Sequence, residues 1–583
     1  MSLYNDASLA MIPSAVKDGK LYSIRPTDGS GDFTFSRGSN LAATRVDVNG
    51  LIEKGRENLF LQSPYLGNVV WGRNGTSITS GQSGYDGTSN AYKLTADGST
   101  GSHYINQNLS TTGVTTASVY AKADGYNFLF IYRESRNTGY YYNLATGELG
   151  SPYAGGDIDA TITSVGNGWY RCAFTFNHSG TSDVTFFIGD SDNNFTFTGD
   201  GTSGILLQHP QLESSLVATD YIETGASTAQ AGITEDLPRL DYSGGASCPS
   251  LLLEPTRTNL VPQSEYILNG YYTVTSGTII TTNYGTSPEG LDNSSRLDSS
   301  NANGGWYTSG MSVSSGETYT CSIFAKLVSG SESDIVRFGF SLNGDKLSHY
   351  DISDGTINYS HPNLTTSIED YGNGWYRLIQ TLTTTSSGTL RQVFYSHNAA
   401  GDYEIYGNQV ESNASYVSSY IPTYGSAVTR SEDSCSKTSA TSLIGQSEGS
   451  FYIEINIDKL SLENRFILTL SNLAQSEGFF VRHRSSNELQ FYSFGLTNNF
   501  DFRDSIISGG TYKLAGAYKS GDIVFYVNGV QINTDTTIFS TPDLSVIRLG
   551  RSLSSATSLG GGINQALLFK TRLTNGELQA LTQ

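Results

Sequence analysis

The sequence predicts an all-β protein made of tandem β-sandwiches, and three observations carry this prediction. The chain has 583 residues, 64 of them glycine, and only 15% of its residues are charged, against about 25% in a typical globular protein. Short runs alternate apolar and polar residues with period two, the pattern of half-buried strands. A long segment also occurs twice. A chain of this length exceeds one hydrophobic core, so several domains are expected.

The repeat has a period of roughly 200 residues, and six landmarks appear in the same order in both copies. The clearest reads Gly-Asn-Gly-Trp-Tyr-Arg at both 166–171 and 372–377. We therefore expect residues 51–228 and 257–430 to be two copies of one sandwich, a jelly roll. The other landmark pairs are 56–63 with 257–264, 117–122 with 321–326, 142–147 with 350–355, 211–213 with 409–411, and 221–224 with 420–423.

Within each copy the expected elements are short strands and tight turns. Residues 117–122, 127–132 and 184–188 are strand-like runs in the first copy. The Asn-Gly pairs at 167–168 and 373–374 predict hairpin turns, since a type I′ turn needs positive φ at both central positions.

The remaining segments do not belong to the repeat. Residues 431–583 contain a clean alternation at 451–457 and a strand–turn–strand pattern over 512–529, and they predict a third sandwich. A capping box from Thr574 to Glu577 predicts a short final helix. Residues 1–50 and 229–256 are expected to hold strands that lead into the sandwich that follows each of them.

Charge and cysteine content exclude several classes of protein. The net charge is −20, and without a basic stripe the chain is not expected to bind nucleic acid. No apolar run approaches the roughly 20 residues of a membrane-spanning helix, and the N-terminus lacks the basic and apolar regions of a signal peptide. The four cysteines stand far apart without metal-ligand spacing, so we expect free thiols and synthesis in a reducing cytosol.

Several phrases of the sequence resemble virion proteins of tailed bacteriophages that carry carbohydrate-binding-module-like sandwiches. The C-terminal segment is similar to the concanavalin A-like or laminin-G-like lectin fold, on Tyr518, Gly521-Asp522 and residues 526–529. The first copy departs from the pattern with Glu223 where the second has Pro422. The phrases that carry the phage resemblance are residues 35–39, 43–47, 50–52, 56–59, 238–242, 248–255 and 257–260, together with the Gly-Asn-Gly-Trp-Tyr-Arg landmark and the landmark pairs 211–213 with 409–411 and 221–224 with 420–423.

The resemblance implies a protein of the virion surface, made in the host cytoplasm, as a tail fibre or a head fibre. It implies a homo-oligomer, with a trimer as the working expectation, and contact with a host surface glycan without catalysis. Because residues 1–50 are too few for a full sandwich, we expect them to attach the chain to other virion proteins. The net charge favours a neutral or cationic polysaccharide as the ligand.

Aromatic residues without a counterpart in the other copy are the candidate glycan contacts. Trp71, Trp306 and Tyr307 stand among polar residues, and Tyr140 opens a run of three tyrosines. Aromatic residues without a core role tend to be exposed for contact. By contrast Trp169 and Trp375 follow Asn-Gly turns inside apolar strands, so we expect them to anchor the core.

One loop predicts a structural calcium site. Asp190, Asp192 and Asn194 place oxygen donors at alternate positions, although the glycine and distal glutamate of an EF-hand are missing. The alternative for this loop is an Asx-rich turn.

Two patterns could indicate catalysis, and for both we favour a structural role. Residues 445–449 match G-x-S-x-G, but a strand-like run follows where a nucleophile elbow needs a helix. Glu454, Asn456 and Asp458 share one face of a strand, as the carboxylates of a retaining glycosidase would, yet the middle carboxylate is an asparagine. Two alternatives to the adhesin remain open: a purely structural capsid decoration or cement protein, and a polysaccharide depolymerase.

Overall fold

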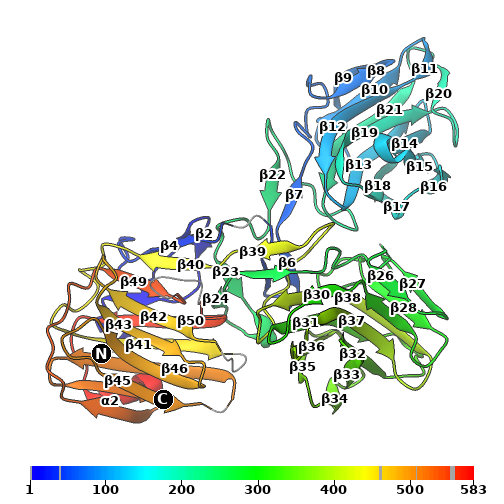
Figure 1. Cartoon of the computed structure of the whole chain (residues 1–583). Helices are drawn as coiled ribbons and strands as arrows, with labels where there is room; N and C mark the ends of the chain where they lie inside the picture. The colour runs from blue at the N-terminus through cyan, green and yellow to red at the C-terminus, as the bar shows by residue number, and fades with distance from the viewer. Residues whose placement is uncertain (1–2, 39–40, 269, 458–462, 507, 552–557) are drawn as a thin grey trace.

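The fold is all-β, as predicted, and consists of three sandwiches (Figure 1). The computed structural model describes residues 3–38, 41–268, 270–457, 463–506, 508–551 and 558–583. The only α-helices in this described part are α1 (Leu3–Asp6) and α2 (Asn575–Thr582), at the two ends of the chain.

The first sandwich packs two six-stranded antiparallel sheets against each other. In spatial order, the first sheet holds β17 (Asp159–Gly166), β18 (Trp169–Asn177), β13 (Val114–Asp124), β21 (Gly204–Glu213), β10 (Ala91–Ala96) and β9 (Thr76–Gln82). The second sheet holds β16 (Glu148–Tyr153), β15 (Thr138–Asn143), β14 (Phe128–Arg133), β19 (Gly180–Gly189), β12 (Tyr104–Thr111) and β8 (Gly72–Asn74), and β11 (Thr100–Ser102) pairs with β20 (Thr196–Thr198).

The second sandwich repeats the strand order of both sheets, with β29 (Gly305–Thr308) and β30 (Met311–Val313) together in the place of β12, which confirms the internal repeat. Ser118 pairs with Gln211 in the first sandwich and Ser322 with Gln409 in the second, and a β-bulge follows at both places. Its first sheet holds β35 (Thr365–Asp370), β36 (Tyr376–Thr383), β31 (Thr318–Leu327), β38 (Gly401–Ser412), β28 (Ser295–Ser299) and β27 (Thr278–Thr281), with β25 (Arg257–Asn259) on β38 and β39 (Val428–Arg430) on β25. Its second sheet holds β34 (Thr356–Tyr359), β33 (Asp345–Asp351), β32 (Ile335–Ser341), β37 (Gly388–Ser396), β29 (Gly305–Thr308) and β26 (Tyr272–Val274), with β30 (Met311–Val313) on β37.

The third sandwich is assembled from three separate stretches of the chain. One sheet holds β23 (Arg239–Asp241), β24 (Ser250–Leu253), β50 (Gly561–Phe569), β41 (Glu448–Ile457), β46 (Gly510–Lys519), β47 (Ile523–Val527) and β48 (Val530–Asp535), with β1 (Leu9–Met11) on β50. The other holds β2 (Val16–Lys17), β3 (Lys20–Leu21), β4 (Phe33–Ser36), β40 (Ser434–Lys437), β49 (Val546–Leu549), β42 (Arg465–Ser471), β43 (Gly478–His483), β44 (Glu488–Phe494) and β45 (Asp501–Ser505).

This assembly corrects the expected organisation of the chain. Strands of the N-terminal segment are not separate from the third sandwich, because β1 pairs with β50. In the same way β4 pairs with β40 (Figure 1). Attachment of this segment to other virion proteins stays a prediction. Residues 229–256 do not lead into the second sandwich alone, because β24 also pairs with β50. The physical reason is the alternation along β4, where Phe33 and Phe35 are buried and Thr34 and Ser36 are exposed.

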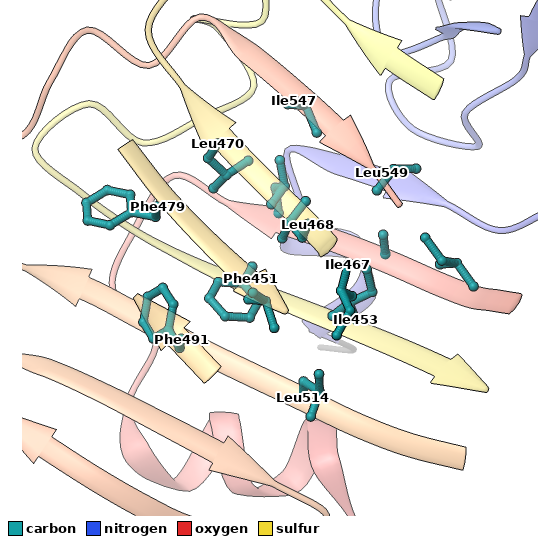
Figure 2. Packing of buried hydrophobic residues seen from close by; sticks show 14 of the residues in the cluster. Phe451, Ile453, Ile467, Leu468, Leu470, Phe479, Phe491, Leu514, Ile547 and Leu549 are labelled. Carbon is teal, nitrogen blue, oxygen red and sulfur yellow. The ribbon is translucent and has the colours of Figure 1, made fainter. Parts of the chain in front are cut away.

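The core of the third sandwich explains why the added strands stay in place. Phe451 and Ile453 of β41 face Leu468 and Leu470 of β42 across the space between the sheets (Figure 2). The side chains of the N-terminal strands belong to the same buried cluster. Removing them would therefore expose apolar surface of the C-terminal segment, at a cost of roughly 25 cal/mol per Å². The residues contributed from outside residues 431–583 are Leu9, Met11, Leu21, Phe33, Phe35, Leu251 and Leu253.

A buried ionic cluster joins the N-terminal segment, residues 229–256 and the start of the third sandwich. Arg239 forms ion pairs with Glu254 at 2.7 Å and with Asp433. Arg37 lies 3.3 Å from Asp433, and Arg430 lies 3.1 Å from Glu254. Burial lowers the pKa of Arg37 to about 10, so it stays charged at neutral pH. Three of these five residues lie in the phrases that resemble phage proteins, so those phrases contribute to a buried structural contact.

A hairpin from the N-terminal segment covers the second sandwich. It consists of β5 (Thr44–Val46) and β6 (Ile52–Lys54), and Ile52 packs in one cluster with the buried Trp375. The amino group of Lys54 lies 3.0 Å from a carboxylate oxygen of Glu265 and 3.0 Å from one of Glu289. The first sandwich is linked by a two-stranded ribbon of β7 (Arg56–Asn58) and β22 (Ala229–Ala231).

Candidate functional site

Two of the predicted glycan contacts are core residues. Trp71 is 2% exposed and its ring lies 5.1 Å from that of Phe60. Trp306 is fully buried and packs edge-on to Tyr272 at 5.0 Å. The prediction that these tryptophans are exposed is therefore wrong. Polar neighbours in the sequence do not decide where a side chain points. Trp306 faces inward from β29, Trp71 lies just before β8, and both rings belong to the cores of their sandwiches.

The two predicted tyrosines have different positions. Tyr140 is half-buried, and its ring lies 5.8 Å from Phe174 at the edge of the core. Tyr307 follows Trp306 in β29 and so points to the outer face of its sheet, where Arg391 lies over its ring at 5.3 Å. Trp169 and Trp375 are each 2% exposed, which confirms them as core anchors.

The predicted calcium loop has the hydrogen bonds of an Asx-rich turn. The Asp190 carboxylate accepts from Asn194 at 2.8 Å, within the loop. The Asp192 carboxylate instead accepts from the backbone and hydroxyl of Ser151, at 2.9 and 2.7 Å. In the described ranges, no three His, Cys, Asp or Glu side chains are gathered as a metal site would require. The carboxylate oxygens that would bind calcium therefore accept hydrogen bonds from different parts of the sandwich, and calcium binding stays a prediction.

The patterns weighed for catalysis lie in the third sandwich. Residues 445–449 lead directly into β41, so G-x-S-x-G lies at a loop-to-strand junction rather than at a nucleophile elbow. The Glu454 carboxylate accepts hydrogen bonds from Tyr452 at 2.9 Å and Asn564 at 3.1 Å. Asp458, the third residue of that pattern, lies outside the described residues.

The most distinctive surface of the molecule is the outer face of the second sheet of the first sandwich. Alternation along β14 sends Leu129 and Ile131 into the core and leaves Phe128, Phe130 and Tyr132 on the other side. The same alternation on neighbouring strands adds further rings, and together they form the aromatic face. Its buried centre is Phe130, Tyr141 and Phe187, and around it lie the half-buried Tyr104, Phe128, Tyr132, Tyr153 and Phe195.

The strand register brings the central rings together. Phe130 pairs with Tyr141 on one side and with Phe187 on the other. The rings of Phe130 and Tyr141 are stacked at 4.3 Å, and Tyr153 and Phe195 lie 5.5 and 5.4 Å from Phe130. Such contacts add about 0.5–1.5 kcal/mol per pair beyond burial, so the rings hold one another in place.

Polar groups border the aromatic face. Beyond Tyr104 and Phe187, the same side of β12 and β19 continues with Asn106, Asn108 and Asp183. Asn108 donates to the Asp183 carboxylate at 2.7 Å. At the base of the face, the buried hydroxyl of Tyr141 has no hydrogen-bond partner among the described residues, and burial raises its pKa. Half-buried aromatic rings beside amide and carboxylate groups suit a ligand that presents both C–H groups and hydroxyl groups.

The sequence analysis did not predict the aromatic face. It drew attention to residues that differ between the copies and stand among polar neighbours, whereas the rings of the aromatic face stand in apolar strands. The signal that could have identified it is the aromatic residue at every outward position of 128–132, where a strand exposed to water would alternate to polar.

Residues 429–579 match the family model of the concanavalin A-like lectin/glucanases superfamily. No curated protein matches the chain. The matched range ends within α2 and excludes the N-terminal strands that complete the third sandwich.

Solved structures resemble about a quarter of the chain. One is the carbohydrate-binding module CBM40 of the Ruminococcus gnavus IT-sialidase bound to α2,6-sialyllactose, with 14% identity, 24% of this chain and 85% of that chain covered, and a TM-score of 0.22. Another is domain 4 of the arabinanase AbnA from Geobacillus stearothermophilus in complex with arabinotriose, with 15% identity, coverage of 26% and 73%, and a TM-score of 0.22. A third is the heptameric SAP-like pentraxin of Limulus polyphemus, with 12% identity, coverage of 24% and 70%, and a TM-score of 0.19. Because these TM-scores are low, we infer nothing about this chain from the three structures.

Among the described residues, no helix has the length and apolar character needed to cross a membrane.

Proposed function

We propose that this chain is a non-catalytic, glycan-binding structural protein of a bacteriophage virion, displayed on the particle as a tail fibre or head fibre. The aromatic face of the first sandwich is the observation that carries the glycan-binding part. The lectin superfamily match over residues 429–579 supports the same function class.

The aromatic face suits a neutral saccharide. Phe130, Tyr141 and Phe187 are buried and support the half-buried rings around them, such as Tyr132 and Tyr153. Sugar rings present C–H groups that can pack on these half-buried rings. Asn106, Asn108 and Asp183 lie beside the aromatic face to exchange hydrogen bonds with sugar hydroxyls. Only half-buried rings surround the centre, so a chain of sugars would lie across the face rather than enter a deep pocket.

The virion part of the proposal rests on the sequence phrases that resemble phage proteins. A particle displays many copies of each surface protein, so weak single sites would add up to firm attachment. Homo-oligomerisation, with a trimer as the working expectation, would serve the same end. Because β1, β2, β3 and β4 help to build the third sandwich, attachment to other virion proteins would use that whole sandwich rather than a free N-terminal segment.

The test is glycan binding by the full chain and by two matched variants. Tyr153→Ala removes a half-buried ring of the aromatic face, whereas Tyr65→Ala removes a tyrosine that is 53% exposed on the same sandwich but outside that face. On an array of neutral polysaccharides, Tyr153→Ala should weaken binding about tenfold and Tyr65→Ala should leave it unchanged.

Other outcomes favour the alternatives. No binding by the folded wild-type chain, together with its presence in purified particles, would favour a cement protein. Release of reducing ends from a host polysaccharide, abolished by Glu454→Gln, would favour a depolymerase.

A further inference from the structure

The second sandwich presents a different chemistry at the place where the first has its aromatic face. In the first sandwich Phe130 of β14 pairs with Tyr141 and Phe187. In the second, Arg337 of β32 pairs with His349 and Tyr395. The strand order of the two sheets is the same, so a guanidinium, an imidazole and a phenol replace the three central rings.

These residues belong to a larger group on the outer side of the sheet, which we call the arginine–histidine face. Arg337 lies over the Tyr395 ring at 5.6 Å, and Arg391 lies over the Tyr307 ring at 5.3 Å. The His349 ring lies 4.3 Å from that of His397 and 5.0 Å from that of Tyr359. The face consists of Tyr307, Arg337, His349, Tyr359, Arg391, Tyr395 and His397.

Two cations on this face lack an anionic partner among the described residues. Neither Arg337 nor Arg391 forms an ion pair within the part of the chain that the structure describes, although the chain has 54 acidic residues. Arg337 donates instead to the neutral side chain of Asn303, and its Nε is buried without a partner in the same described part. Asp345 is the acidic residue that acts on Arg337, and it does so at a distance greater than that of an ion pair.

We propose that the arginine–histidine face binds an acidic saccharide, a chain whose sugar units carry carboxylates. A guanidinium recognises a carboxylate with two parallel hydrogen bonds, and Tyr307 and Tyr395 hold the arginines over their rings while offering surface to a sugar. The expectation that net charge −20 repels an acidic polysaccharide does not apply here, because charges beyond about 8–10 Å are largely screened at physiological salt.

This site is independent of the aromatic face, which serves neutral saccharides under the proposed function. The probes are tetragalacturonate, its fully methyl-esterified form and a hyaluronan tetrasaccharide, each titrated into the full chain by calorimetry. Arg337→Gln and Arg391→Gln remove the unpaired cations. Arg296→Gln is the matched control, because Arg296 also lies over a tyrosine ring of the second sandwich, Tyr284 at 5.0 Å, but is paired with Asp402.

We expect binding of at least one carboxylated probe, no binding of the ester, and a loss of about tenfold or more in either face variant but not in Arg296→Gln. Raising the salt concentration should weaken binding. The proposal is overturned if the wild type binds neither carboxylated probe, if the ester binds equally well, or if a peptide of glutamates binds as tightly as the saccharides. Loss of neutral-glycan binding in Tyr153→Ala would not change the binding of the carboxylated probes. The neutral-saccharide site and the acidic-saccharide site can therefore be disproved independently.

Discussion

Phe130 in the first sandwich and Arg337 in the second occupy the same position of the same strand in two copies of one fold. Each pairs with the corresponding two neighbours, Tyr141 and Phe187 in one case and His349 and Tyr395 in the other. The inner sides of the two strands are equally apolar, so both copies keep the same core. The repeat has therefore preserved the scaffold while the outer face has changed from aromatic to cationic.

Trp306 and Tyr307 are adjacent in β29 but should respond differently to removal. Trp306→Ala should lower the free energy of unfolding of its sandwich by about 3–5 kcal/mol, because the ring is fully buried between the sheets. Tyr307→Ala should cost only about 1 kcal/mol, since its ring is half-exposed. Urea unfolding monitored by fluorescence measures both, and equal losses would contradict the assigned sides of the strand.

The N-terminal strands should be needed for the third sandwich to be stable. Phe35→Ala should lower its free energy of unfolding by about 3–5 kcal/mol, because Phe35 is 1% exposed in the shared core. Thr34→Ala, at the exposed neighbouring position of β4, is the control. A chain lacking residues 1–36 should be cleaved rapidly by protease within residues 431–583. Unchanged protease resistance would show that the C-terminal segment folds without them.

Asp433→Asn should loosen the buried ionic cluster. The substitution leaves Arg37 and Arg239 buried with one carboxylate fewer, which typically costs about 3–5 kcal/mol. The comparison is Asp522→Asn, which removes the partner of Arg572 from a pair whose aspartate side chain is 55% exposed and should change stability by less than about 1 kcal/mol. Differential scanning calorimetry measures both variants. The cluster would lose its assigned role if the two variants melted alike.

The third sandwich should lose stability in mild acid through His483. Burial, reinforced by the positive charge of Arg465, lowers the pKa of His483 to about 4. The unfolded chain binds this proton near pH 6.5, so stability falls as the pH drops from about 6.5 to 4, by up to about 3 kcal/mol. His483→Gln should remove this part of the pH dependence, measured as unfolding free energy against pH. Parallel curves for variant and wild type would contradict it.

The fold class and the repeat could be predicted from the sequence because both depend on local sequence patterns. Alternation at 117–122 and 451–457 marks strands whatever they pair with. It could not find the partners of β1 and β4, because strand pairing across more than 400 residues leaves no local trace. The sequence analysis also misplaced Trp306, since alternation shows that the two sides of a strand differ but not which side faces the core. It misplaced Trp71 because that residue precedes β8, where no alternation applies. The arginine–histidine face was partly found through Tyr307.

The central claim is that the two copies use the same sheet face for different saccharides. The most direct measurement is a cryo-electron microscopy or crystallographic map of the full chain with both a neutral oligosaccharide bound by the wild type and tetragalacturonate. We expect density for the neutral sugar across the half-buried rings of Tyr132 and Tyr153, and density for the acidic sugar with its carboxylates against Arg337 and Arg391. Both sugars on one face, or density confined to the third sandwich, would contradict it.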